Sequence, residues 1–272
     1  MKLEELYRVA DLVTVVTGGA SGMGLAMAET MAENGANVTL FDLDGEAAER
    51  AAALLRGRGY AVSAARVDVT DAAALEQAFA AVVARTGRLD VLFANAGISG
   101  GPGFLDFDRQ RNVPAALEAI DPAFFDRVVS MNLGSIFRTI RAAVPHLKAS
   151  GGGKIVVTSS ISATRVETFV GTSYVASKAG VAQLVRQLAF ELAAFGINVN
   201  AIAPGPMVTN IAGGRLQNPE VQAAIGRDIP MHRIGVPQDV IGAGLFLASP
   251  AARYVTGAEI LIDGGITLGI AD

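Results

Sequence analysis

The sequence lacks the residues on which many metal and disulfide proteins depend. Its 272 residues include no cysteine and only two histidines, His146 and His232. Without cysteine the chain forms neither disulfides nor thiolate metal sites, and two histidines do not make a His-rich centre. We therefore expect no metal, and a reducing compartment, the cytoplasm, is consistent with this composition.

Targeting segments and nucleic-acid-binding signals are also missing. The first twelve residues, MKLEELYRVADL, lack the apolar core of a signal peptide, and no uninterrupted apolar run reaches membrane-spanning length. The formal net charge is -4, and the Lys and Arg residues are scattered rather than clustered. We expect no membrane and no nucleic acid among the partners. The 51% hydrophobic and 18% charged content is typical of a globular protein with a large core.

Short apolar runs alternate with longer Ala-rich segments of helical spacing. The runs show little polar alternation, which is typical of strands buried on both faces of a sheet, and the alternation with helices predicts parallel βαβ units. We predict an α/β fold: a Rossmann-type, doubly wound sheet of about seven mainly parallel strands with helices on both faces, in one domain over 1–272. The runs are 12–17, 37–42, 61–67, 89–95, 154–160, 197–203 and 258–263.

Two longer segments interrupt this rhythm, 98–121 and 204–236. Each follows the carboxyl end of a predicted strand, which is the edge where open α/β sheets bind ligands. We expect both to be irregular loops on the substrate side. The first is a lid, a substrate wall or a subunit contact, and the sequence leaves these alternatives open.

A glycine-rich stretch, TGGASGMG (17–24), follows the first predicted strand and precedes a helix. Such a turn directs backbone N–H groups and a helix N-terminus at an anion. Gly18 can form the turn, Gly22 can allow a phosphate to approach the backbone, and Gly24 can pack the helix on the strand. The spacing differs from G-x-G-x-x-G, so a purely structural turn is the alternative.

The second predicted strand ends in an acid, Asp42, 18 residues after Gly24. A carboxylate there can accept both hydroxyls of an adenosine ribose and repels a 2′-phosphate. The residue that follows it is Leu43, not Arg, so we expect no cation nearby. This favours NAD over NADP; the alternative is that Asp42 caps the next helix or is merely solvated.

The segment YVASK places Tyr174 and Lys178 four residues apart, on one face of a helix. A nearby ammonium favours the phenolate, so we expect Lys178 to lower the tyrosine's pKa and make it a usable acid/base. Ser160 ends the preceding strand and could hydrogen-bond the same substrate oxygen. Ser159 and Ser162 compete for this role; we prefer Ser160 because it closes the strand.

Taken in order, these motifs resemble the short-chain dehydrogenase/reductase family over nearly the whole chain. They are TGGASGMG, ANAG (94–97), Asn132 in MNLGSIF, SS before YVASK, NAIAPGPMVT and IDGG (262–265). The interval between Asn95 and Asn132, 37 positions, is longer than in most members, and the extra residues fall in 98–121.

The resemblance implies a role for each matching position. Tyr174 is the acid/base, Lys178 also holds the nicotinamide ribose, Ser160 orients the substrate oxygen, and Asn132 holds a water for proton relay. Substrate contacts are expected from Ser160, Ser162, Tyr174 and Met207. The resemblance assigns the remaining cofactor contacts to Gly18, Ser21, Gly22, Met23, Gly24, Asp68, Val69, Asn95, Ala96, Gly97, Pro204, Gly205, Val208 and Thr209. Asp42, from the ribose argument above, and its neighbour Leu43 complete the expected set.

The expected function is therefore that of an NAD-dependent oxidoreductase. It would exchange a hydride between NAD and a secondary alcohol, such as a polyol or a small cyclic compound. The alternatives are an NADPH-dependent ketone or 3-ketoacyl reductase and a non-catalytic NAD-sensing regulator. The resemblance also implies a homotetramer, and the only other partner expected is the small alcohol or ketone.

Overall fold

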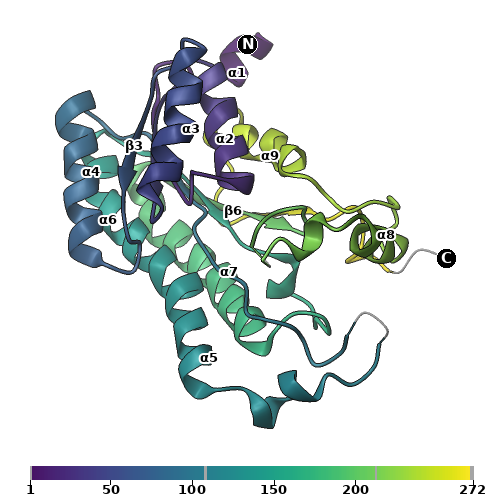
Figure 1. Ribbon diagram of the computed structural model, residues 1–272. Coiled ribbons are helices and arrows are strands. Elements are labelled where there is room, and N and C mark those ends of the chain that lie inside the picture. Colours follow the sequence, from purple (N-terminus) through teal and green to yellow (C-terminus); the bar gives the residue numbers. More distant parts are fainter. Residues whose placement is uncertain (1, 107–108, 212, 270–272) are drawn as a thin grey trace.

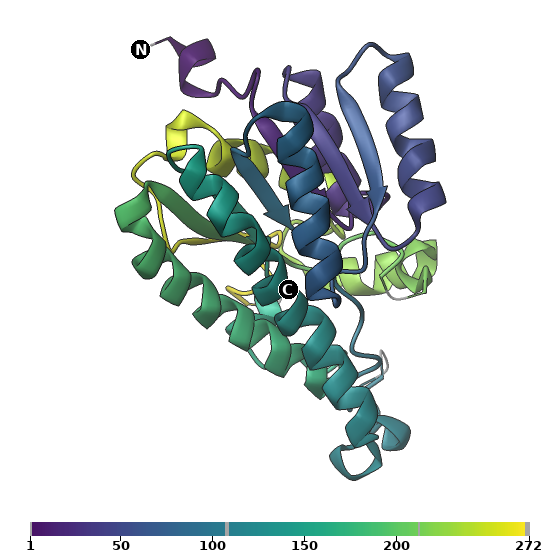
Figure 2. The same cartoon turned by 90° about the vertical axis from the view of Figure 1, so that its left-hand side faces the viewer.

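The computed structural model describes residues 2–106, 109–211 and 213–269. Within these ranges one parallel sheet runs in the order β3-β2-β1-β4-β5-β6-β7 (Figures 1 and 2). All seven predicted strands are present, with ends that differ by at most two residues. Their bounds are β1 Val13–Thr17, β2 Asn37–Asp42, β3 Val62–Arg66, β4 Val91–Ala94, β5 Gly153–Thr158, β6 Ile197–Pro204 and β7 Glu259–Ile262.

The sheet has a hydrophobic core on each face, as the strand sequences predict. Successive strand residues point to opposite faces, so Val15 belongs to one core and its neighbour Val16 to the other. The first core is closed by α4 (Ala72–Thr86), α6 (Ser135–Ala149) and α7 (Thr172–Leu192). The second is closed by α2 (Gly22–Glu33), α3 (Gly45–Gly57) and α9 (Ile241–Ala248).

A long helix carries a π-turn at its middle. It comprises α5 (Pro122–Val129), the π-turn Ser130–Gly134 and α6, with right-handed helical backbone at both junctions. Its start is encoded locally, because the Asp121 carboxylate accepts the N–H of Ala123 and Pro122 occupies the first helical position. The π-turn contains Asn132.

Caps and glycines mark several helix boundaries. Asp71 caps α4 by accepting two backbone N–H groups, and Gly87 ends it with φ +80°. Gly35 follows α2 with φ +87°. At the end of α3 the left-handed residue is Gly59, whereas Gly57 is still the last helical residue.

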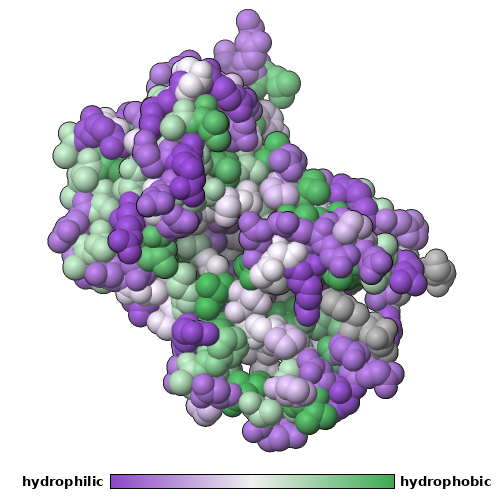
Figure 3. Space-filling view, in the orientation of Figure 1, coloured by the Kyte–Doolittle hydropathy of each residue, from purple (hydrophilic) through white to green (hydrophobic). Residues whose placement is uncertain are grey.

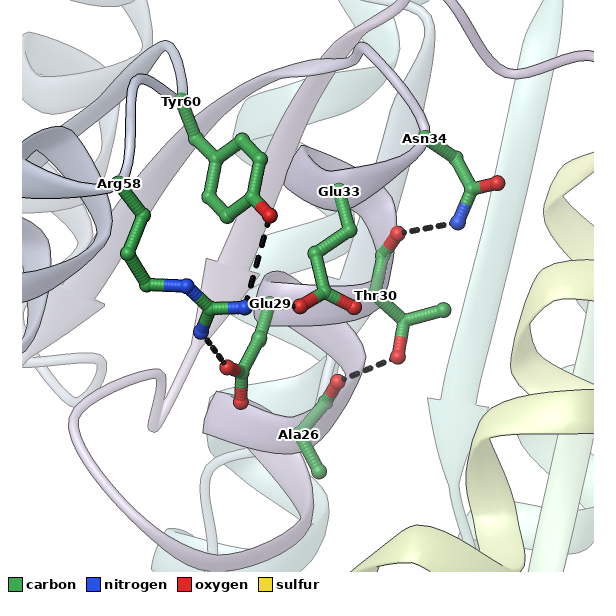
Figure 4. Close-up of polar contacts among 7 residues, drawn as sticks. All are labelled: Ala26, Glu29, Thr30, Glu33, Asn34, Arg58 and Tyr60. Atoms are coloured by element: carbon green, nitrogen blue, oxygen red, sulfur yellow. Dashed lines mark hydrogen bonds and ion pairs between the residues drawn. The ribbon is translucent and has the colours of Figure 1, made fainter.

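Arg58 ties the turn between α3 and β3 to α2 (Figure 4). Its guanidinium pairs with both Glu29 and Glu33 of α2 and lies 5.0 Å from the centre of the Tyr60 ring. Glu29 and Glu33 are one helical turn apart, so a single planar cation reaches both. This exposed cluster braces the helix whose other end forms the glycine turn.

The two segments that interrupt the rhythm lie at the carboxyl edge of the sheet. The described part of segment 98–121 has only short 3₁₀ turns and isolated β-bridges, and residues 107–108 lie outside the described ranges. Segment 204–236, apart from residue 212, contains the helix α8 (Pro219–Arg227), so the expectation of irregular chain is wrong there. Asn218 caps α8 and Pro219 is its first residue, a start signal that the sequence contains.

The surface is mixed in character. On the face shown in Figure 3, hydrophilic and hydrophobic residues are interspersed over the helices. Of the helices in the described ranges, which include the short α1 (Leu3–Leu6), none has the length and hydropathy that crossing a bilayer requires.

Candidate active site

The glycine turn joins β1 to α2 and has the conformation that its sequence predicts. Gly18 and Gly22 have φ of +63° and +56°, the left-handed region that favours glycine. A Cβ at Gly24 would lie 2.1 Å from the Gly18 carbonyl oxygen, so the helix can approach the turn only with glycine there. At Gly22 a Cβ would meet nothing nearer than the Thr209 methyl group, at 3.7 Å. The turn therefore leaves space at the helix N-terminus, which suits a phosphate.

Asn95 fixes this turn to the ends of the neighbouring strands. Its amide donates to the carbonyls of Thr17 and Gly18 and accepts from the Thr158 hydroxyl. The Thr17 hydroxyl in turn accepts the N–H groups of Asn95 and Ala96. The Asn95 side chain thus holds β1, β4 and β5 in register at the switch point of the sheet.

Asp42 lies beside the glycine turn. Its carboxylate accepts the N–H of Ala20 at 3.0 Å and of Asp44 at 3.1 Å, which orients it while leaving lone pairs for a ligand. The cap of α3 is Asp44, not Asp42. One expectation is wrong: a cation is close, because strand pairing sets Arg66 opposite Asp42 and its Nε donates to the Leu43 carbonyl.

Asp68 and Val69 follow β3 at the same edge of the sheet. Asp68 accepts hydrogen bonds from the hydroxyl and the N–H of Thr70, which hold its pKa below the usual range, and Val69 is buried. A carboxylate kept ionised here is compatible with a polar ligand.

A cavity of about 470 Å³ opens beside the turn, and segments 98–121 and 204–236 both contribute residues to its lining. Twelve of the predicted site residues line it, including all four catalytic candidates. They are Met23, Asn95, Gly97, Asn132, Ser160, Ser162, Tyr174, Lys178, Pro204, Gly205, Met207 and Thr209. The predicted residues outside its lining are Gly18, Ser21, Gly22, Gly24, Asp42, Leu43, Asp68, Val69, Ala96 and Val208.

The predicted residues inside and outside the cavity lining come from different parts of the chain. The residues outside the lining belong mostly to the glycine turn and to the ends of β2 and β3. The segment after β6 connects the two regions, because Thr209 reaches Gly22 while Pro204 and Gly205 line the cavity. The predicted site residues thus lie along one continuous edge of the sheet, some of them outside the cavity and the others in its lining.

The catalytic candidates contact one another inside the cavity. Tyr174 and Lys178 share a face of α7, with the Lys178 Nζ 5.5 Å from the centre of the tyrosine ring. That Nζ donates to the Thr158 carbonyl at 2.8 Å. Ser160 is hydrogen-bonded to Tyr174, and its Oγ lies 3.1 Å from the Oγ of Ser162.

These contacts separate the three serines. Ser160 reaches the phenol, and Ser162 stands behind it, with its N–H donating to the Ser160 Oγ at 3.1 Å. The Ser159 hydroxyl is buried, with no hydrogen-bond partner among the described residues. The geometry therefore favours Ser160 as the serine that orients a substrate oxygen.

The electrostatics of the pair differ from the expectation. Burial raises the pKa of Tyr174, the hydrogen bond from Ser160 opposes this, and the Glu167 carboxylate raises it further. Burial lowers the pKa of Lys178 to about 8, with Glu259 opposing. Lys178 is not among the causes of this shift, so the expected lowering of the tyrosine's pKa by Lys178 is not found; desolvation dominates, with a contribution from an acid, Glu167, that the sequence did not single out.

Asn132 is fully buried in the π-turn and is engaged by the chain itself. Its Oδ1 accepts the Ile98 N–H at 2.8 Å, and its Nδ2 donates to the Ile98 carbonyl at 3.0 Å. A weaker contact of 3.4 Å reaches Ser177, whose hydroxyl donates to the Tyr174 carbonyl. Asn132 thereby connects the start of segment 98–121 to the catalytic helix.

Glycines bring that segment against the catalytic helix. A Cβ at Gly100 would lie 2.5 Å from the Tyr174 Cβ, and one at Gly171 would lie 1.9 Å from the Gly100 carbonyl oxygen. Sequence reasoning missed both positions. The signal was present, since paired glycines in a long segment often mark close backbone approach.

A Rossmann-type sheet, a glycine turn with space for a phosphate and a Tyr–Lys–Ser cluster together are typical of a dinucleotide-dependent oxidoreductase. The family model described as enoyl-(acyl carrier protein) reductase matches residues 18–267. The chain belongs to the short-chain dehydrogenase/reductase family and is an oxidoreductase that acts on CH–OH groups with a nicotinamide dinucleotide.

Curated relatives match along nearly their whole length. The 2,5-dichloro-2,5-cyclohexadiene-1,4-diol dehydrogenase LinX of Sphingobium indicum is 38% identical over 263 residues, covering 97% of this chain and 99% of that one. The cis-4-hydroxycyclohexanecarboxylate dehydrogenase of Sinomonas cyclohexanicum is 39% identical over 258 residues, covering 95% and 97%.

Solved structures agree in fold and differ in bound cofactor. A 7α-hydroxysteroid dehydrogenase complexed with NADH and 7-oxo glycochenodeoxycholic acid superposes with a TM-score of 0.86 at 31% identity, covering 100% of this chain and 99% of that one. A protein from Beutenbergia cavernae, with NADP bound at low occupancy, has a TM-score of 0.85 at 32% identity, covering 97% and 99%.

Proposed function

We propose that this protein is an NAD-dependent dehydrogenase of small hydroxylated secondary alcohols, with Tyr174 as its acid/base. The observation that carries the proposal is the convergence of Tyr174, Ser160 and Lys178 in one cavity beside the glycine turn, which contributes Met23 to its lining. A bound nicotinamide dinucleotide would accept the hydride in oxidation and supply it in reduction.

The proton chemistry belongs to the side chains. The Ser160 hydroxyl is hydrogen-bonded to the Tyr174 phenol, so a carbinol oxygen that contacts both groups would be oriented by both. In oxidation the Tyr174 oxygen takes the carbinol proton, and in reduction it returns the proton to the carbonyl oxygen. The buried Lys178 amine, with a pKa of about 8, can bind or release a proton beside the phenol. We assign Asn132, through its contact with Ser177, to the hydrogen-bond network that would carry the proton from the active site to solvent.

The phosphates would be held at Gly18, Ser21, Gly22, Met23 and Gly24. Asn95, Ala96 and Gly97 would flank the adenosine ribose side, Asp68 and Val69 the adenine, and Pro204, Gly205, Val208 and Thr209 the nicotinamide end. What supports this is the open space at Gly22 and the reach of Thr209 toward it. The list rests otherwise on the family pattern.

Asp42 supports a preference for NAD, because its oriented carboxylate suits ribose hydroxyls and repels a phosphate. Arg66 supports NADP as the second candidate, because it lies opposite Asp42 in the sheet. The test is kcat/KM for each cofactor in the wild type and in Asp42→Ala. We expect the wild type to have the higher kcat/KM with NAD, and we expect Asp42→Ala to reduce the difference in kcat/KM between NAD and NADP. A wild-type preference for NADP would overturn the assignment.

The lining of the cavity supports a small cyclic or polyhydroxylated alcohol as the substrate. Apolar side chains and hydroxyl groups both line it, among them Ile161, Phe169, Met207 and Ser162. The relatives named above act on a ring diol and a ring alcohol. We propose such a compound as substrate, with Ser160, Ser162, Tyr174 and Met207 in contact.

The test of the function is the Tyr174→Phe variant. Loss of the general acid/base is expected to lower kcat by about 10²- to 10⁴-fold, while NADH binding persists. Tyr254→Phe is the matched control, because that side chain is fully exposed. A Tyr174→Phe enzyme with wild-type turnover would refute the assignment. Binding of NAD without turnover of any alcohol by the wild type would favour the regulator.

Several further expectations stay predictions. They are the homotetramer, the cytoplasmic location and the single catalytic domain with substrate-side segments 98–121 and 204–236. The participation of every described strand in one sheet supports the single domain. Light scattering of the purified protein would measure the oligomeric state.

A further inference from the structure

An acid in the cavity has no part in the proton chemistry described above. Glu167 lies between β5 and α7 and lines the same cavity as Tyr174. Its side chain is 13% exposed, and its Oε1 is buried with no hydrogen-bond partner among the described residues. Buried carboxylate oxygens are costly to leave unsatisfied, so this oxygen indicates a missing hydrogen-bond donor.

The neighbours of Glu167 fix its position. The Arg165 Nε lies 3.2 Å from Oε1, outside hydrogen-bond geometry, while the Arg165 Nη1 donates to the Ile266 carbonyl at 2.7 Å. On the other side the Thr168 carbonyl accepts the Leu105 N–H at 3.0 Å. Contacts on both sides therefore anchor the chain that carries Glu167, and the carboxylate itself is paired with Arg165, an arrangement present before a ligand binds.

The charge around Glu167 selects the kind of donor. Arg165 already neutralises much of its charge, so a cationic ligand gains little there and would face the guanidinium. A neutral hydroxyl can donate to Oε1 without that repulsion. Glu167 is also close enough to raise the pKa of Tyr174, which places it near the reacting oxygen.

We propose that Glu167 determines substrate specificity by accepting a hydrogen bond from a second hydroxyl of the substrate, so that the enzyme prefers diols and polyols to alcohols with one hydroxyl. This rests on the proposed function, since the first hydroxyl is the one held by Ser160 and Tyr174. Hydrogen bonds to charged groups are strong enough for roughly a 10- to 100-fold preference.

The experiment compares cyclohexanol with cyclohexane-1,2-diol and cyclohexane-1,4-diol in the wild type, Glu167→Gln and Glu167→Leu. The ratio of kcat/KM for the better diol to that for cyclohexanol is expected to fall at least about tenfold in Glu167→Leu. Glu167→Gln keeps an acceptor oxygen, so its ratio is expected to lie between those of the wild type and Glu167→Leu. Glu4→Gln, on the exposed helix α1, is the matched control and is expected to keep the wild-type ratio.

Calorimetry of the same ligands with the NAD-loaded protein separates this proposal from the proposed function. A diol preference in binding that Glu167→Leu abolishes supports the role of Glu167 even without turnover, in which case the dehydrogenase function fails. If Glu167→Leu lowers kcat/KM equally for the diols and for cyclohexanol, the role of Glu167 is overturned. It is also overturned if the wild type turns over both kinds of substrate with no preference for the diols. A stronger preference for 2-aminocyclohexanol than for the diol overturns it as well. If Glu167→Leu does not fold, the ratio in Glu167→Gln decides alone.

Discussion

The substitution Asn132→Ala tests whether this residue supports the site mechanically as well as chemically. Its amide makes two bonds to the Ile98 backbone, of 2.8 and 3.0 Å, from a fully buried position. At about 1–1.5 kcal/mol for each bond, the variant loses about 2–3 kcal/mol of unfolding free energy. For a chain of this size that lowers the melting temperature by roughly 4–12 °C.

The assay is thermal unfolding followed by circular dichroism, with turnover measured at a temperature where both proteins are folded. Asn34→Ala is the control, because Asn34 makes one exposed bond to the Thr30 carbonyl and is expected to change stability by less than about 0.5 kcal/mol. A melting temperature for Asn132→Ala within 1 °C or so of wild type would refute this reasoning. Asn132 would then serve only the proton relay, and turnover alone would fall.

Two further substitutions probe the cofactor edge and the buried lysine. Gly24→Ala places a methyl group 2.1 Å from the Gly18 carbonyl oxygen, so NADH affinity measured by fluorescence is expected to fall at least about tenfold, whereas Gly57→Ala, with open space around it, keeps wild-type affinity. Equal affinities would contradict the packing described for the turn. Lys178 has a folded pKa of about 8, below its unfolded value, so the unfolded chain binds more protons between pH 8 and about 10.4, and stability rises with pH there. Denaturant unfolding of the wild type should show a rise of about 3 kcal/mol across this window, and Lys178→Met should not. The same rise in both proteins would exclude Lys178 as its source.

The sheet was predictable because its signals are local. Strands buried on both faces have an unbroken apolar sequence, and caps such as Asp71 and Gly87 mark helix ends with their own chemistry. The glycine turn was predictable for the same reason, since Gly18 and Gly22 need their left-handed backbone whatever surrounds them. These features depend on a few neighbouring residues, so the sequence alone states them.

The electrostatic details were not predictable, because they arise between residues distant in sequence. Arg66 meets Asp42 only through the pairing of β2 and β3. The pKa of Tyr174 follows its burial and the position of Glu167, neither of which the YVASK motif contains. The motif predicts that Tyr174 and Lys178 lie close together, whereas their surroundings in the fold determine the pKa of each.

The glycine contacts between segment 98–121 and the catalytic helix limit how this enzyme can change its substrates. Because Gly100 and Gly171 touch through their backbones, a shift of the segment at that point displaces the helix turn that carries Tyr174. Insertions near residue 100 would therefore disturb catalysis along with recognition. Among the described glycines of the segment, those that approach the start of the catalytic helix are Gly100 and Gly101, so directed evolution of new substrate range is best begun further along the segment, away from these contacts with the helix that carries the acid/base.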